Sequence, residues 1–239
     1  MSSSMSQQLL DKYYKSEDHP FHVFERKIVT NLDKGFTVVD AGCGAEAPLL
    51  VNLVGKARDL IGVDLVDFHQ SLHGKGISLL NNDLANIEVE SSSVDMVVSR
   101  SVLEHVRNVD GVYKEINRIL KPGGRFLFLV PNLWDYVSLA SYMIPNTFHK
   151  TIVARLSDRA PDDTFPTYYR SNTNKSIRRL ARTSGFAVNS IEYFGQYPYM
   201  LQFNGLLFYL GILYDKTLCK THYLKYLRGW ILAELTKTN

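Results

Sequence analysis

Short apolar segments of strand length alternate with segments of helical periodicity from residue 36 onward. Each short segment is almost continuously hydrophobic, which is typical of strands covered on both faces. This alternation predicts βαβ units and a parallel sheet with helices on both sides. The expected strands are 36–40, 60–64, 77–80, 94–98, 125–130 and 186–194.

Capping residues mark the expected helices between the later strands. Asp110 is a suitable N-cap for a helix whose apolar residues recur at helical spacing as far as Leu120. Thr173 or Asn172 is a suitable N-cap for a later helix, and Gly185 follows its end. The pattern therefore predicts one doubly wound, Rossmann-like α/β domain, which suits a chain of 239 residues of which 45% are hydrophobic.

Charge is distributed unevenly along the chain. Residues 150–239 hold 13 Lys and Arg against 6 Asp and Glu, a net +7, whereas the remainder holds 14 against 18, a net −4. A solvated basic face explains this difference, and so does an anionic substrate or membrane surface near the C-terminal part. The first twenty residues lack the pattern of a secretory signal, so we expect a cytoplasmic protein, with peripheral contact with a membrane left open.

A glycine-containing segment follows the first expected strand. Gly42 and Gly44 lie in DAGCGAEA, where glycine permits positive φ and close approach of a ligand to the backbone. Asp64 ends the next strand, where a carboxylate can accept hydrogen bonds from ribose hydroxyls. Each signal alone also fits a tight turn or a helix cap, but together they favour a nucleoside site. With Ala47 in third place the segment also fits a dinucleotide fingerprint, so an NAD(P)-dependent oxidoreductase is an alternative.

Further segments resemble class I S-adenosylmethionine-dependent methyltransferases over residues 36–132. They are VVDAGCG, IGVD, NNDLANIEVESSSVDMVVSRSVLEHV and LKPGGRFLFLVPN, in the family's order and approximate spacing. Glu46 departs from the family, which often has a small residue there, and this leaves the shape of the loop open. The resemblance implies S-adenosyl-L-methionine as cofactor and a seven-stranded sheet whose antiparallel last strand is 230–237.

The resemblance also implies roles for matching residues. Gly42 and Gly44 would lie under the cofactor, Asp40 would order their loop, and Asp64 would hold the ribose. Asp83, the acidic residue of NNDL, would accept a hydrogen bond from the adenine amine, although it also suits a turn. The remaining implied positions are Leu84 beside Asp83, and Ser99 with Arg100 near the methionine portion of the cofactor.

Candidates for handling the acceptor lie beyond the fourth strand. A hydroxyl acceptor would benefit from a general base, and His105 is the nearest candidate in sequence. In the alternative interpretation Glu104 and His105 only form the wall of the pocket. Further candidates of equal weight, in the segment where the fold builds acceptor pockets, are Asp135, His149, Tyr168 and Tyr169.

Several features bear on the acceptor and on partners. The segment SRSV lacks the Asn-Pro-Pro-aromatic motif common in enzymes that methylate bases, which disfavours nucleic acid. FPTYYRSNT loosely resembles methyltransferases of bacterial glycan and lipid-linked sugar pathways, so we expect O-methylation of a small-molecule, sugar or lipid-linked acceptor. Residues 216–228 mix aromatics with cations, which fits either a packed helical hairpin or an interfacial helix.

The remaining predictions concern organisation and metal. His69 and His73 share helical spacing, but nearby glycines argue against a helix and we expect no metal. A methyltransferase-fold protein that binds without catalysing remains a second alternative. We expect one domain, with an N-terminal helical lid at 1–35, a cofactor-binding core at 36–132, an acceptor-side insertion at 133–171, and completion of the sheet at 172–239 that includes a helical insertion at 198–227. The lid would carry Tyr13, Tyr14, His19 and Phe21, which ordinary packing explains equally well.

Overall fold

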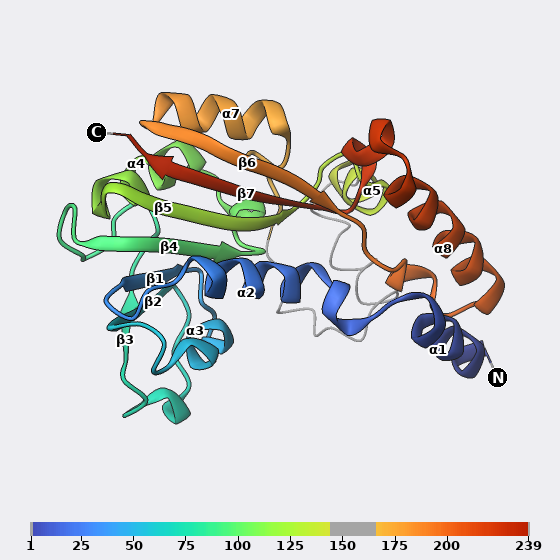
Figure 1. Cartoon of the computed structure of the whole chain (residues 1–239), viewed down its shortest axis with the longest axis horizontal. Coiled ribbons are helices and arrows are strands. Elements are labelled where there is room, and N and C mark those ends of the chain that lie inside the picture. Colours follow the sequence, from blue (N-terminus) through green and yellow to red (C-terminus); the bar gives the residue numbers. More distant parts are fainter. Residues whose placement is uncertain (1, 144–165, 239) are drawn as a thin grey trace.

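A seven-stranded sheet forms the centre of the molecule in the computed structural model, which describes residues 2–143 and 166–238 (Figure 1). Its strand order is β3-β2-β1-β4-β5-β7-β6. The first five strands in the sequence run parallel to one another, and β7 runs antiparallel to both β5 and β6. The expected doubly wound fold with an antiparallel last strand is thereby confirmed. The strands are β1 (Thr37–Ala41), β2 (Asp59–Asp64), β3 (Ile77–Asn81), β4 (Val94–Arg100), β5 (Leu120–Pro131), β6 (Phe186–Phe194) and β7 (Trp230–Lys237).

Helices cover both faces of the sheet, as the nearly continuous apolar strands require (Figure 1). Alternation along β5 shows the two layers: Phe126 and Phe128 belong to the core cluster that includes α4 and α7, whereas Leu127 and Leu129 belong to the cluster that includes α2 and α3. The α-helices are α1 (Ser2–Tyr13), α2 (Pro20–Asn31), α3 (Pro48–Leu53), α4 (Val109–Ile119), α5 (Tyr136–Met143), α7 (Asn174–Thr183) and α8 (Gly205–Lys220).

Two helix caps test the sequence predictions. Asp110 is not the N-cap of α4. Instead, the side chain of Asn108 accepts a hydrogen bond from the amide of Gly111 at 3.2 Å, and Asp110 pairs with Arg179 at 2.9 Å. Gly111 makes this possible, because a Cβ there would lie 2.4 Å from the Asn108 amide nitrogen. Thr173 does cap α7.

Helices α1 and α8 lie beyond the end of the sheet at which the parallel strands terminate (Figure 1). Between β6 and β7 the chain forms the 3₁₀ turn η5 (Tyr199–Leu201), α8 and the 3₁₀ segment η6 (His222–Leu227). Trp230, the first residue of β7, pairs with Pro131, the last residue of β5. The α8 region therefore enters the sheet at the edge formed by the carboxyl ends of the parallel strands, where ligands bind in open α/β sheets.

Candidate functional site

The glycine loop after β1 has a conformation that its sequence makes accessible. Gly42 and Gly44 have φ of +85° and +71°, in the left-handed region that favours glycine. The amides of Gly42 and Cys43 both donate to the carbonyl of Val63, at 2.8 and 3.2 Å. A Cβ on Gly42 would lie 2.3 Å from a methyl carbon of Val102. The loop is thus held against β2 on one side and against Val102 on the other.

Asp64 joins this loop to the end of β2. One carboxylate oxygen accepts from the amide of Gly44 at 2.7 Å, and the other accepts from the amide of Leu65 at 2.7 Å. The oxygen bound by Leu65 also accepts from the amide of Val66 at 3.4 Å, whereas the oxygen bound by Gly44 keeps a lone pair for a further donor. Asp64 therefore orders the loop and still offers an acceptor to a ligand.

The turn after β3 contributes the next wall. The Asp83 side chain is exposed and accepts from the amide of Ala85 at 2.8 Å, which is the turn role that the sequence also allowed. Leu84 is buried beside it. Asp83 thus forms the turn and also places its carboxylate, a hydrogen-bond acceptor, at the lining of a cavity.

One cavity of about 430 Å³ collects most of these residues. Its size lies within the range of pockets that bind small molecules and cofactors. The lining comes from the ends of β1, β2 and β3 and from the segment after β4. It includes Gly42, Asp64, Asp83, Leu84, Val102 and His105.

Asp40 and Ser99 lie behind the cavity, not among its lining residues. The Ser99 hydroxyl is buried and donates to the carbonyl of Ala41 at 2.8 Å, so its side chain is occupied in joining β4 to β1. Asp40 is buried as well, and burial raises its pKa to about 7. The nearby Arg100 opposes this pKa rise and the charge of Asp64 adds to it. Both residues act on the site through its framework.

Arg100 connects the end of β4 to the N-terminal helix α2. Its guanidinium pairs with Glu25 at 2.8 Å and lies over the ring of Phe21 at 4.7 Å. Phe21 in turn packs edge-on against Trp230 at 5.4 Å. Residues from α2, β4 and β7, far apart in sequence, therefore meet at this end of the sheet.

Glu104, the neighbour of His105, carries a buried carboxyl. The sequence indicated only that Glu104 could form part of the pocket wall. Its residue is 4% exposed, and burial raises its pKa to about 8. Its Oε2 atom has no hydrogen-bond partner within residues 2–143 and 166–238. Its backbone carbonyl accepts from the amides of Tyr168 and Tyr169, at 2.7 and 3.2 Å. A carboxyl four residues beyond the fourth strand was the available signal, but its burial could not be read from spacing.

His105 lines the cavity and is oriented by two neighbours. Its Nδ1 lies 3.0 Å from the carbonyl oxygen of Pro166, which can only accept, so Nδ1 carries the proton. Its Nε2 lies 4.0 Å from a carboxylate oxygen of Glu104. In the neutral ring this tautomer leaves Nε2 as a proton acceptor at the edge of the cavity.

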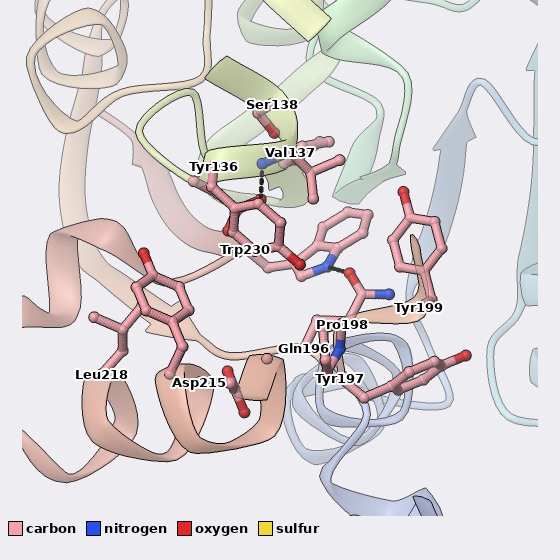
Figure 2. A pocket seen from close by; sticks show the side chains of 15 residues that line it. Tyr136, Val137, Ser138, Gln196, Tyr197, Pro198, Tyr199, Asp215, Leu218 and Trp230 are labelled. Carbon is pink, nitrogen blue, oxygen red and sulfur yellow. Dashed lines mark hydrogen bonds between the residues drawn. The ribbon is translucent and has the colours of Figure 1, made fainter. Parts of the chain in front are cut away.

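A second, smaller cavity of about 70 Å³ lies among aromatic side chains between α5, α8 and the start of β7 (Figure 2). Asp135 lines it, accepts from the amide of Val137 at 3.1 Å, and has its pKa raised to about 6 by burial. Tyr168 and Tyr169 are not among its lining residues, and His149 lies outside the described residues. The aromatic lining is Tyr136, Tyr197, Tyr199, Tyr214 and Trp230, with Asp215 beside it.

The N-terminal residues expected to form a lid make specific contacts. The Tyr14 hydroxyl donates to Asp215 of α8 at 2.8 Å, and Tyr13 packs against Tyr209 with ring centroids 6.3 Å apart. The His19 Nδ1 accepts from the amide of Phe21 and so caps α2. These contacts fix the N-terminal segment to α8 and to the carboxyl edge of the sheet.

The two histidines with helical spacing have local roles. His69 accepts from the amide of Ser71 and caps the 3₁₀ turn η2 (Gln70–Leu72), and His73 follows that turn. Within residues 2–143 and 166–238, no three His, Cys, Asp or Glu side chains are grouped so that they could hold a metal ion.

Comparisons with known proteins agree with this geometry. A family model described as "Methyltransferase domain" matches residues 39–128. Arsenite methyltransferase of Aquipseudomonas alcaligenes is 31% identical over 111 residues, which cover 39% of this chain and 32% of that protein. Sterol 24-C-methyltransferase of Pneumocystis carinii is 28% identical over 129 residues, covering 50% of this chain and 33% of that protein. The chain thus spans about a third of the length of these relatives.

Solved structures extend the likeness over the whole sheet. Geranyl diphosphate C-methyltransferase from Streptomyces coelicolor A3(2) superposes with a TM-score of 0.56 at 15% identity, covering 90% of this chain and 76% of that one. At this identity the likeness concerns the fold. The family match from β1 into β5 makes residues 39–128 similar to a methyltransferase domain, and the solved structure shares the fold of the whole sheet.

Proposed function

We propose that the chain transfers a methyl group from S-adenosyl-L-methionine to a small-molecule acceptor. The observation that carries this proposal is the convergence of the ends of β1, β2 and β3 and of the segment after β4 on one cavity of about 430 Å³. The relatives named above methylate small molecules according to their names, which supports the same class of acceptor and disfavours nucleic acid.

The residues around the cavity suit the cofactor. Gly42 lines the cavity without a side chain, and Leu84 supplies an apolar wall for a ring. Gly44 is not among the lining residues; its amide holds Asp64 in place. Asp64 and Asp83 have only acceptors, which match ribose hydroxyls and an exocyclic amine. When bound, S-adenosylmethionine supplies an electrophilic methyl group on its sulfonium.

The loop geometry disfavours the oxidoreductase alternative. A dinucleotide fingerprint places the pyrophosphate at the N-terminus of the helix that the glycines open. Here α3 begins only at Pro48 and is six residues long, and Ala47 before it has a φ of +41°. Ala47 therefore lies outside the helix and cannot provide the close helix–strand packing that the third position of that fingerprint supplies.

The same geometry supports O-methylation as the finer proposal. An acceptor hydroxyl held at the cavity would lose its proton as the methyl group is transferred, and His105, which lines the cavity, is the candidate base that would take it. Glu104, 4.0 Å from Nε2 of His105, would position the imidazole. A sugar or lipid-linked hydroxyl is the acceptor class we favour, with the aromatic side chains near Trp230 as surfaces for stacking.

The test is release of S-adenosylhomocysteine from S-adenosylmethionine over a panel of hydroxylated sugars, lipid-linked sugars, isoprenoids and sterols. Wild-type protein and His105→Gln are compared, with His69→Gln as control because His69 only caps a turn. We expect turnover with one acceptor class, reduced about 100-fold or more in His105→Gln at unchanged cofactor affinity. Cofactor binding without turnover on any acceptor would instead favour the non-catalytic alternative, and turnover unaffected in His105→Gln would remove the base from the proposal.

A further inference from the structure

The outer face of α8 is apolar although it faces solvent. Leu206 is 64% exposed and Leu210 is 53% exposed, and three neighbours on the same face exceed 40%. Monomeric soluble proteins rarely expose contiguous apolar patches of this kind unless the patch serves an interaction. We call this surface the leucine face; it consists of Leu206, Leu207, Leu210, Leu213 and Tyr214.

Helical periodicity separates this face from the side that packs on the protein. The buried positions of α8 include Phe208, Ile212, Asp215 and Leu218, which recur every three or four residues. The exposed leucines recur on the opposite side. A helix that is hydrophobic on all sides is usually enclosed. α8 is enclosed on only one side by the described residues, so the leucine face lacks a covering partner there.

Cations surround the end of this face, with almost no acids. Residues 195–229 hold four Lys and Arg against one acid, Asp215, which is buried and bound by Tyr14. Lys220 is exposed at the C-terminal end of α8, and η6 follows with Lys225. Tyr223 in η6 is 88% exposed, and Tyr226 is 48% exposed. Leucines flanked by tyrosines and lysines match the composition of helices that lie in the interface of an anionic bilayer.

We propose that the leucine face docks the protein on an anionic membrane surface, with α8 lying in the interfacial plane. The leucines would enter the acyl boundary, while Lys220 and Lys225 meet lipid phosphates. α8 has 16 residues, and no helix in the described part of the chain is long and apolar enough to cross a bilayer, which agrees with a helix lying on the surface. The positive charge around the face favours this partner over an uncharged protein groove.

The placement of α8 would bring the membrane to the substrate side of the sheet. α8 and η6 precede β7 in the chain, and Trp230 at the start of β7 pairs with Pro131 at the carboxyl end of β5. α8 itself lies beyond this end of the sheet (Figure 1). Tyr214, on the leucine face, also lines the small aromatic cavity. An acceptor held in the bilayer would therefore approach from the same end as the proposed cofactor cavity.

The test is flotation of the full-length protein with vesicles of neutral phosphatidylcholine or of phosphatidylcholine with one third phosphatidylglycerol. We expect flotation with the anionic vesicles, weakened at high salt because the lysine contribution is screened. Replacing the leucines by Leu206→Gln, Leu210→Gln and Leu213→Gln together should reduce partitioning at least about tenfold, because apolar burial drives interfacial binding. The replacements are all at exposed positions, so folding is retained.

Controls separate this proposal from its rivals. Val29→Gln with Val54→Gln removes exposed apolar side chains on α2 and after α3, and flotation should be unchanged. Lys220→Gln with Lys225→Gln should reduce binding to anionic vesicles towards the level seen with neutral ones. Flotation of the leucine variant equal to wild type would overturn the proposal. The proposal would also be overturned if the wild-type protein bound no vesicles but dimerised with increasing concentration, and if the leucine variant lost this dimerisation. The assay uses no methyl acceptor, so its failure is distinct from failure of the proposed methyl transfer.

Discussion

The two ends of the substrate edge are built in different ways. On the cofactor side, the cavity is formed by glycine turns and by carboxylates that lie near the ends of successive strands. Most contacts of these residues are with backbone amides. On the acceptor side, aromatic side chains from α2, α5, α8 and β7 meet across the chain, as in the contact of Phe21 with Trp230. The first arrangement is fixed by local sequence, and the second by packing between distant segments. Substitutions should therefore separate the two regions.

The largest effect is expected at Gly42. Gly42→Ala places a Cβ at positive φ and within 2.3 Å of Val102, so it combines left-handed strain with overpacking. We expect a loss of about 4 kcal/mol in the free energy of unfolding, measured by urea denaturation, and loss of cofactor binding. Gly55→Ala is the matched control, since Gly55 also has positive φ but a Cβ there meets nothing within 4 Å. Equal losses in the two variants would show that crowding at Val102 is unimportant.

The next effect concerns Glu104, at the boundary between the two regions. Burial raises its pKa from 4.5 to about 8, so the folded state binds more protons than the unfolded state between these values. Its contribution therefore favours the folded state at low pH and is lost as pH rises through this window. Glu104→Gln should flatten the fall in the free energy of unfolding between pH 5 and 8 by about 3 kcal/mol.

Other buried carboxyls define the background for this measurement. Asp40 and Asp135 also have raised pKa values, about 7 and about 6, and their contributions have the same sign. They should remain in Glu104→Gln, so the pH dependence should be reduced and not abolished. A pH profile identical to wild type would mean that the Glu104 carboxyl is hydrated or paired in solution.

A smaller effect is expected at Tyr14, which connects the N-terminal segment to α8. Tyr14→Phe removes the donor to Asp215, a buried carboxylate whose pKa burial already raises. Loss of this hydrogen bond should lower the free energy of unfolding by about 1–2 kcal/mol while leaving cofactor affinity unchanged. Tyr13→Phe is the control, because Tyr13 contacts α8 through ring packing. A loss of cofactor affinity in Tyr14→Phe would couple the two regions and break the comparison.

The smallest effect lies away from both regions. Thr173 accepts from the amide of Ser176 at the start of α7 and forms a reciprocal capping box with it. Thr173→Ala should cost about 1 kcal/mol in the free energy of unfolding and leave cofactor affinity intact. It sets the scale for a purely structural substitution in this chain.

Sequence predicted the sheet well because each strand is a continuous apolar segment covered on both faces. β6 lies at the expected residues 186–194, and the antiparallel last strand followed from the family resemblance. The cap of α4 was predicted wrongly, since Asp110 and Asn108 are both good caps and only the packing of Asn108 over Gly111 distinguishes them.

The site was predictable to the extent that it is local. Gly42, Asp64 and Asp83 lie directly after their strands, so spacing was enough to bring them to one edge. Tyr14 bonds to Asp215, which lies about 200 residues away in the sequence. Glu104 is contacted by the backbone of Tyr168 and Tyr169, more than 60 residues away. Periodicity does not encode either contact. The side chain of Ser99, used to join β4 to β1, is a further case.

The most direct test of the central claim is calorimetric titration of wild type and Asp64→Asn with S-adenosylmethionine, S-adenosylhomocysteine and NAD. Asp67→Asn, an exposed acid three residues away, is the matched control. We expect binding of the two adenosyl ligands to wild type and Asp67→Asn, an affinity at least about tenfold weaker in Asp64→Asn, and no binding of NAD. Binding of NAD in preference to both adenosyl ligands, or equal affinities in all three proteins, would contradict it.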